Sequence, residues 1–129
     1  MEDNSKKAPL TKTAQARLKG QLAEKYAAVY LEQKGYTILE RNWRWQRAEV
    51  DIIAKKGETL VIVEVKSRSS NTLGEPEESI TPAKEAILID AAGEYARQVA
   101  HIWELRIDII AILFQGKNYQ LRHFEDAIY

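Results

Sequence analysis

Residues 48–66 read AEVDIIAKKGETLVIVEVK, and this stretch predicts the centre of the fold. Two runs rich in β-branched residues, 48–54 and 58–66, flank Lys-Lys-Gly at 55–57, which is typical of a β-hairpin. Successive side chains of a strand point to opposite faces, so the charged residues interrupt otherwise apolar faces. Burying a charged side chain among apolar ones is costly unless the charge is paired or holds a cation. The charged positions are Glu49, Asp51, Glu64 and Lys66.

Two of these positions, Asp51 and Glu64, predict an active centre together with Lys66. Twelve residues separate the two acids across the turn, a spacing with which adjacent strands can bring both carboxylates to one site. With the backbone carbonyl of Val65 they would form an oxygen site suited to Mg²⁺ or Mn²⁺. Lys66 would orient an attacking water or offset the charge that develops on a phosphate. An alternative stays open, because ion pairs on half-exposed sheet faces are commoner than active sites.

A helix before the hairpin adds a third carboxylate. From about Thr13 the apolar pattern is helical, with Gly35 as its C-terminal stop, and most of this helix is expected to be buried. Glu24 lies on a stripe of small residues that would let the helix lie close to a sheet. A charge in that stripe needs a partner, so Glu24 is predicted to be a further metal or water ligand. A solvated or ion-paired glutamate is the alternative.

The remaining pattern completes one domain over residues 13–129. Residues 1–12 are polar and charged and are predicted to be disordered. A strand is expected over 36–43, which with the hairpin gives three antiparallel strands, and a long loop is expected over 67–81. Pro82 suits the first position of a second helix. The later elements are a helix over 82–100 and strands over 106–114 and 118–123.

The composition excludes several kinds of site and location. With 129 residues, 45% of them hydrophobic, the chain can bury one core. It has no cysteine, which excludes disulfides, a thiolate zinc site and a cysteine nucleophile. We expect a cytoplasmic protein without a membrane partner, because no apolar run resembles a secretion signal or a membrane span. Nineteen basic residues balance nineteen acidic ones, so nucleic acid would have to be bound through local charge.

The joined motifs resemble those of the YraN family of bacterial proteins. The resemblance runs from about Gly20 to Ala127 and joins Asn42-Trp43-Arg44, Ala48-Glu49-Val50-Asp51-Ile52-Ile53 and Leu60-Val61-Ile62-Val63-Glu64-Val65-Lys66-Ser67-Arg68. Further matches are Gly20, Glu24, Ala27, Gly35-Tyr36, Gly74, Pro82, Lys84 and Arg106-Ile107-Asp108. This combination is far more specific than an aspartate followed by Glu-x-Lys.

The resemblance implies a restriction-endonuclease-like fold of the α+β class, as in archaeal Holliday junction resolvases. In this fold, helices flank a mixed β-sheet. The resemblance also implies a centre made of a helix glutamate, an aspartate and Glu-x-Lys. These roles fall on Glu24, Asp51, Glu64 and Lys66. The implied partner is DNA, with branched DNA as one expected substrate, and a resolvase-like role implies a symmetric homodimer. Ala48 departs from the family, which has glycine there, and its methyl group would alter the approach of a substrate.

Residues 41–47 are the best local candidate for nucleic-acid binding. Guanidinium groups pair with phosphates in a fork, and indole rings can stack on bases. The predicted set is Arg41, Trp43, Arg44, Arg47 and, after the hairpin, Arg68. The alternative, which the pattern supports equally, is that Trp43 and Trp45 share a strand face and cover the core, with the arginines solvated around them.

Two hypotheses about function come from these features. The first is a Mg²⁺-dependent DNA endonuclease that cleaves phosphodiesters by water attack. The second is a non-catalytic nucleic-acid-binding or protein-interaction module that keeps the fold. The four polar site positions favour the first, whereas the neutral net charge and Ala48 favour the second. Lys84 and Asp108 either support the site or form ordinary salt bridges, and the salt bridges are expected. His101 and His123, which lack the spacing of metal ligands, are expected at the surface.

Overall fold

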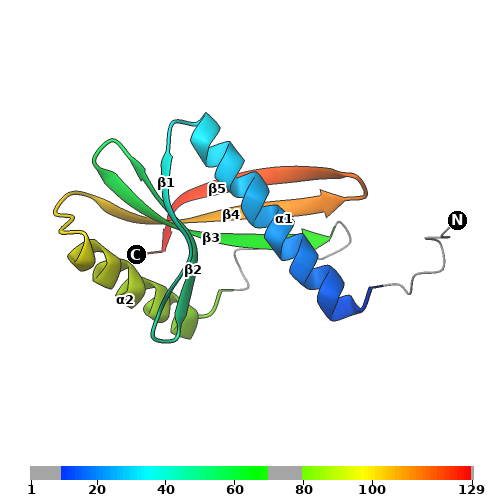
Figure 1. Ribbon diagram of the computed structural model, residues 1–129, viewed down its shortest axis with the longest axis horizontal. Coiled ribbons are helices and arrows are strands. Elements are labelled where there is room, and N and C mark those ends of the chain that lie inside the picture. The colour runs from blue at the N-terminus through cyan, green and yellow to red at the C-terminus, as the bar shows by residue number, and fades with distance from the viewer. Residues whose placement is uncertain (1–9, 70–79, 129) are drawn as a thin grey trace, which may run out of the picture.

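The computed structural model describes residues 10–69 and 80–128, which form two helices and five strands in the predicted order (Figure 1). The elements are α1 (Lys12–Gln33), β1 (Thr37–Trp45), β2 (Ala48–Lys56), β3 (Thr59–Ser69), α2 (Pro82–Gln98), β4 (Leu105–Gln115) and β5 (Asn118–Ile128). Neither of the helices described is long and apolar enough to cross a membrane.

The sheet has the strand order β1-β2-β3-β4-β5 and is mixed. Strands β3 and β4 run parallel, and every other neighbouring pair is antiparallel. Antiparallel neighbours need only tight turns, whereas a parallel pair needs a crossover, which α2 provides between β3 and β4. Gly57 and Gly116 occupy the β2–β3 and β4–β5 turns at φ 59° and 62°, where glycine is favoured. The predicted α+β arrangement with a mixed sheet is confirmed.

Each helix covers one face of the sheet and forms its own core. Alternation along β3 sends Leu60 and Ile62 to the core under α2, and Val61 and Val63 to the core under α1. From α2 the first core receives Leu88, Ala91, Ala92 and Tyr95. From α1 the second core receives Ala23, Ala27, Ala28 and Leu31. The sheet is therefore a middle layer between two helices, and a polar residue on either face needs a partner.

Helix α1 is less buried than predicted. Four of its residues are buried, and they are the ones that face the sheet. Leu18, Leu22 and Val29, on another side of the helix, are 49, 39 and 43% exposed. The expectation of a largely buried helix is wrong, because a single helix on the outside of a sheet has packing partners on one side only. No second helix covers its back in the described part of the chain.

Several elements begin or end elsewhere than predicted. Helix α1 begins at Lys12, because Thr11 caps it by accepting a hydrogen bond from the Ala14 N–H at 3.0 Å. Strand β5 continues to Ile128 instead of ending at His123, because its pairing with β4 resumes after an irregularity. Residues 70–79 of the predicted loop, and 1–9 of the predicted disordered segment, lie outside the described residues.

Strands β2 and β3 separate where the predicted site lies. Their pairing ends at Ile52 and Val63, after which β2 stays with β1 and β3 stays with β4. Val50 and Ile53 both join the core under α2, although regular alternation would place them on opposite faces. Strand β2 is therefore irregular around Asp51, as strands often are next to functional sites. The two strands form a fork (Figure 1), and Asp51 lies at its base, next to the last paired residue of β2, Ile52.

Candidate functional site

A cleft of about 540 Å³ opens between the separated strands and the start of α2. Its charged lining consists of Arg47, Glu49, Asp51, Glu64, Lys66 and Lys84. Thr81 caps α2 by accepting a hydrogen bond from the Lys84 N–H at 3.2 Å, and Pro82 begins the helix, so the first turn has a fixed position beside the fork. Ala48 also lines the cleft, with its side chain in the core under α2. The predicted residues Asp51, Glu64 and Lys66 thus lie in one cleft.

At the base of the fork, the Asp51 side chain accepts a main-chain hydrogen bond that a neighbouring strand would otherwise accept. Beyond Val63, β3 no longer has β2 as its neighbour, and the Val65 N–H donates a hydrogen bond to Asp51 Oδ2 at 2.8 Å. This bond satisfies a main-chain donor that the fork would otherwise leave unpaired. The carboxyl groups of Asp51 and Glu64 are within hydrogen-bonding reach of each other. Continued pairing beyond Ile52 and Val63 would also place Asp51 opposite Glu64, and the fork keeps the two acids together while it opens a cleft beside them.

Glu64 is only 3% exposed, and its surroundings satisfy its charge incompletely. Lys84 Nζ lies 2.7 Å from Glu64 Oε2, and Lys66 Nζ lies 3.8 Å from the same oxygen. The shorter contact is an ion pair whose direction does not suit a hydrogen bond, so Oε2 has no hydrogen-bond partner among the described residues. A buried oxygen in this state is unusual and often marks a place where a ligand or ion belongs.

Burial and repulsion raise the pKa of one acid of the pair. Burial raises the pKa of Asp51 to about 8, and the hydrogen bond and the negative charge of Glu64 act in the same direction. Asp51 therefore keeps its proton to a higher pH than an exposed aspartate does. Burial lowers the pKa of Lys66, although the charge of Glu64 opposes this. Burial also lowers the pKa of Lys84, but the close carboxylate of Glu64 outweighs it, so the pKa of Lys84 is raised.

Glu24 lies outside the cleft, half-buried on α1. Burial raises the pKa of Glu24, although the charge of Arg41 and a hydrogen bond with the Asn42 side chain oppose this. Its charge acts on both Asp51 and Glu64. Within residues 10–69 and 80–128, no three acidic or histidine side chains gather closely enough to hold a metal ion. The role of Glu24 as a third ligand stays a prediction.

The segment 41–47 divides between the core and the solvent. Trp43 and Trp45 pack against the core under α2, and Trp43 meets Tyr95 edge to face with ring centroids 5.2 Å apart. These positions match the alternative in which the indole rings cover the core. Arg44 pairs with Glu49 at 3.1 Å. Of the other predicted arginines, Arg41 is exposed, Arg47 is exposed in the cleft wall, and Arg68 is half-buried at the end of β3.

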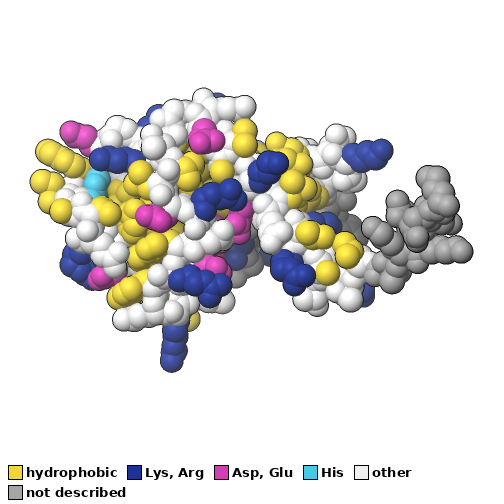
Figure 2. All heavy atoms as spheres, viewed as in Figure 1, with side chains coloured by type: hydrophobic (Ala, Val, Ile, Leu, Met, Phe, Trp, Pro, Cys, Tyr) yellow, Lys and Arg dark blue, Asp and Glu magenta, His cyan; other side chains and the backbone are white. Residues whose placement is uncertain are grey.

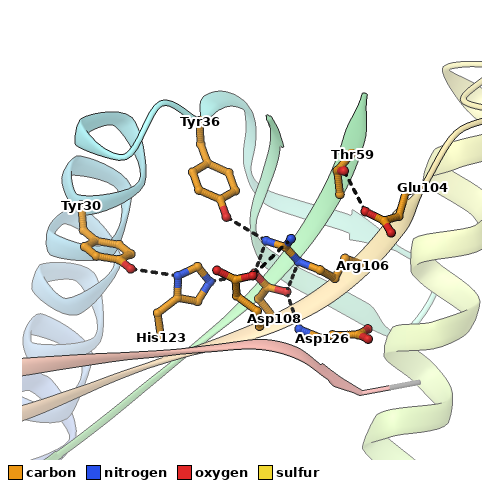
Figure 3. Close-up of polar contacts among 9 residues, drawn as sticks. Tyr30, Tyr36, Thr59, Glu104, Arg106, Asp108, His123 and Asp126 are labelled. Atoms are coloured by element: carbon orange, nitrogen blue, oxygen red, sulfur yellow. Dashed lines mark hydrogen bonds and ion pairs between the residues drawn. The ribbon is translucent and has the colours of Figure 1, made fainter. Parts of the chain in front are cut away.

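A second group of polar side chains lies on the α1 face of the sheet (Figure 3). Asp108 is fully buried and accepts hydrogen bonds from Arg106 Nε and Nη2, at 2.8 and 2.9 Å, and from the Asp126 N–H at 2.9 Å. His123 Nε2 lies 2.7 Å from Asp108 Oδ2, and His123 Nδ1 lies 3.0 Å from Tyr30 Oη. The expected surface position of His123 is wrong, because its side chain is 7% exposed between β4 and α1.

Asp108 forms the predicted salt bridge, but within a fully bonded network. Burial alone would raise the pKa of Asp108, and the bonds from His123, Arg106 and the Asp126 N–H outweigh burial and lower it. Arg106 Nη2 also donates to Tyr36 Oη at 2.7 Å. Figure 3 shows His123 and Arg106 on either side of Asp108, with Tyr30 beyond His123 and Tyr36 above the group. The network joins β4 and β5 to α1 and to the start of β1.

The fold and the cleft define a small α+β protein with paired carboxylates where two strands separate. The chain belongs to the Uncharacterised protein family UPF0102, the YraN family, whose model matches residues 23–112. The predicted family resemblance is confirmed. UPF0102 protein FP2501 of Flavobacterium psychrophilum is 46% identical over 110 residues, covering 85% of this chain and 92% of that protein. A UPF0102 protein of Beutenbergia cavernae is 45% identical over 95 residues, covering 73% of this chain and 80% of that protein.

Two solved structures are distantly similar. Hjc of Archaeoglobus fulgidus, a Holliday junction resolvase, has a TM-score of 0.46 and 18% sequence identity, covering 81% of this chain and 75% of that chain. SfsA of Pyrococcus furiosus, in complex with Ca²⁺, has a TM-score of 0.41 and 15% identity, covering 85% of this chain and 63% of that chain.

The sequence gives only a weak signal that Lys84 belongs to the cleft. A lysine in the first turn of a helix is unfavourable beside the positive end of the helix dipole, and this misplacement is the signal that it has a special partner. The partner is Glu64. The burial of His123 has no comparable local signal, since it depends on Tyr30 of a distant helix. His101 is partly exposed, with Nε2 2.7 Å from the Glu104 carbonyl oxygen.

Proposed function

We propose that this protein is a metal-dependent endonuclease that hydrolyses DNA phosphodiesters in the cleft between β2, β3 and α2. The observation that carries the proposal is the adjacent carboxyl groups of Asp51 and Glu64, in a cleft that also contains the amines of Lys66 and Lys84. Paired carboxylates hold divalent cations, and amines attract phosphates. The cleft therefore combines the two kinds of group that phosphodiester hydrolysis requires.

The paired carboxylates fit a divalent cation such as Mg²⁺ or Mn²⁺. Both supply the oxygen ligands that these ions prefer, and Glu64 Oε2 has no hydrogen bond to lose. The repulsion between Asp51 and Glu64 is the kind of strain that a shared cation relieves. The carbonyl of Val65 stays a predicted further ligand. When bound, such an ion polarises a phosphate and lowers the pKa of a water molecule.

The two lysines have different tasks in this proposal. Lys66 is half-buried 3.8 Å from Glu64 Oε2, so its amine would orient a water molecule beside the pair. Lys84 lies closer to the same oxygen, at 2.7 Å, and its side chain is 43% exposed. Lys84 would exchange the carboxylate for a phosphate oxygen of the substrate, because its exposed end can reach the open side of the cleft.

A non-catalytic nucleic-acid-binding module is the second candidate, and one observation favours it. Lys66 and Lys84 together offset the two acids, so the cleft balances its formal charge without a metal ion. In that case the cleft would contact phosphates through its lysines and would not cleave them. The two candidates differ in a single measurable property, metal-dependent turnover.

A cleavage panel separates the two candidates. Linear duplex, flapped and four-way DNA are each incubated with the protein and Mg²⁺ or Mn²⁺, and the products are resolved on denaturing gels. The branched DNAs are included because the family resemblance implies them. Sedimentation of the protein, alone and with four-way DNA, tests the symmetric homodimer that a resolvase-like role implies.

Substitutions in the hairpin identify the source of any cleavage. Asp51→Asn should lower cleavage by about 100-fold or more, because the amide keeps the shape but loses the charge. Lys66→Ala should lower turnover without weakening metal binding. Glu58→Gln removes an exposed carboxylate from the turn of the same hairpin and should cleave like the wild type. If the wild type cleaves none of these DNAs with either metal, the endonuclease proposal fails and the second candidate replaces it.

A further inference from the structure

Among the residues that the structure describes, positive charge is concentrated at one end of the fold. Three segments, 10–23, 65–69 and 109–124, contain no aspartate or glutamate. They are the first half of α1, the last residues of β3, and most of the β4–β5 hairpin. Their cations outside the cleft are Lys12, Arg17, Lys19, Arg68, Lys117 and Arg122. We call these three segments the basic end.

The fold brings these segments together. Lys19 Nζ donates a hydrogen bond to Ser69 Oγ at 2.9 Å, which joins α1 to the end of β3. Tyr26 stacks on Tyr119 with ring centroids 4.1 Å apart, which joins α1 to the β4–β5 hairpin. In Figure 2 the described part of this end, at the right, carries dark-blue side chains and no magenta ones, whereas magenta side chains lie over the other end.

A groove of about 270 Å³ runs between α1 and the end of β3. Its helix side consists of Lys12, Gln15, Ala16 and Lys19, which are spaced so that they share one face of the helix. Its strand side consists of residues 67–69, which supply two serine hydroxyls and Arg68. The groove therefore offers amines, a guanidinium group and hydroxyl donors, and no carboxylate from the described residues.

We propose that the basic end binds the sugar-phosphate backbone of nucleic acid and leads it to the cleft. For the position of the reacting phosphate, this inference rests on the proposed function. Arg68 lies two residues beyond Lys66 on β3, or about 7 Å along the strand. Lys12 and Lys19 are separated by two helical turns, or about 10 Å, so their amines can reach different phosphates of one strand. A backbone that leaves the cleft along β3 would therefore meet the groove next.

The same cations could also attract an anionic membrane surface, and the structure favours nucleic acid. Helix α1 does expose Leu18 and Leu22 beside its basic residues. A helix that lies in a membrane surface needs its large apolar face free, whereas the apolar face of α1 that contains Ala27 and Leu31 is packed on the sheet. A narrow groove with hydroxyl donors suits a phosphodiester chain better than a flat layer of headgroups.

The salt dependence of DNA binding tests this inference. Fluorescence anisotropy of a labelled DNA duplex is measured in EDTA, so that cleavage plays no part, over a series of potassium chloride concentrations. The test variant combines Lys12→Gln, Lys19→Gln and Arg68→Gln. If each cation contacts one phosphate, the slope of log affinity against log salt should fall by about 1 per substitution, and affinity at low salt should fall by about tenfold or more.

A matched variant at the other end of the molecule controls for net charge. It combines Lys34→Gln, Lys55→Gln and Lys56→Gln, three exposed lysines that lie near Glu32 and Glu58 in the sequence. Both variants must melt like the wild type. An equal loss of affinity in the two variants would refute a localised DNA site. Binding to vesicles of phosphatidylcholine with phosphatidylserine, without binding to DNA, would assign the basic end to membranes and overturn the inference.

The outcomes distinguish this inference from the proposed function. If the slope changes as expected but no DNA is cleaved with Mg²⁺ or Mn²⁺, the basic end binds nucleic acid and the endonuclease proposal fails. If DNA is cleaved and the test variant binds and cleaves like the control variant, the endonuclease proposal stands and this inference is overturned.

Discussion

Asp108 and Glu64 are both buried acids of the same sheet, but their surroundings differ. Asp108 faces α1, and both of its oxygens have hydrogen-bond partners, from Arg106, His123 and the Asp126 N–H. Glu64 faces the cleft, where Oε2 has two amines nearby but no hydrogen bond. Their locations differ as well, since the Asp108 network lies beneath α1 and the Glu64 cleft is open to solvent.

The pKa values of Asp108 and of Asp51, which neighbours Glu64 in the cleft, move in opposite directions. The bonds to Asp108 overcome its burial and lower its pKa, whereas burial and Glu64 raise the pKa of Asp51 to about 8. A network in which every charge has its partners fixes the packing of the fold. A pair of acids without such partners weakens the fold and is the usual mark of a functional site.

The largest expected effect is on the Asp108 network. Asp108→Ala should lower the free energy of unfolding by about 3–5 kcal/mol, because it removes the fully buried carboxylate that bonds half-buried Arg106 and His123. Urea denaturation at neutral pH measures this loss. If Asp108→Ala were as stable as the wild type, the network would contribute nothing and the difference between the two acids would disappear.

A pH series with Asp108→Asn sharpens this prediction. A carboxyl group whose pKa is lowered on folding stabilises the protein above its ordinary value of 3.8. That stability is lost as the pH falls through the pKa of the folded state. The difference in unfolding free energy between the wild type and Asp108→Asn should therefore shrink as the pH falls below 3.8.

The opposite behaviour is expected of Asp51. In EDTA, Asp51→Asn should raise the free energy of unfolding at pH 8 by about 1 kcal/mol, or Tm by about 4 °C. A carboxyl group whose pKa is raised on folding is most favourable below its ordinary value of 3.8, and this advantage is lost as the pH rises toward about 8. The wild type should therefore lose stability across this window, and the variant should lose less.

Thermal melts across the window check the effect, with Glu58→Gln as the control for removal of a carboxylate from the same hairpin. Mg²⁺ should raise the Tm of the wild type more than that of Asp51→Asn, because the ion relieves the repulsion within the pair. A variant that melts below the wild type at pH 8 would mean that the bond from the Val65 N–H needs the charge of Asp51, and that the pair is structural.

Local signals account for the parts of the fold that sequence predicts well. The hairpin follows from two β-branched runs around Gly57, which adopts the positive φ that the turn requires. The start of α2 follows from Thr81 and Pro82, which favour the cap and the first helical position. The parallel pairing of β3 and β4 joins residues far apart in the sequence, so no local sequence pattern predicts it. The mixed sheet is predicted through the family resemblance instead.

The candidate site is predictable in its members but not in its geometry. Charged residues on apolar strands single out Asp51, Glu64 and Lys66, because burial makes unpaired charge costly. The contact of Asp51 with the Val65 N–H depends on an irregular β2, which alternation of side chains does not reveal. The burial of His123 arises when α1 packs over β5, and a histidine among polar neighbours gives no sign of this.

The smallest expected effect concerns the exposed ion pair of Arg44 and Glu49. Their side chains are 77 and 46% exposed, and the charged atoms lie 3.1 Å apart, so solvent screens the pair. Arg44→Gln should change the free energy of unfolding by less than about 0.5 kcal/mol in urea denaturation. Because Glu49 already offsets its charge, the same variant should weaken DNA binding by about threefold or less. A loss larger than that of the variant at the basic end would instead support the segment 41–47 as the nucleic-acid site.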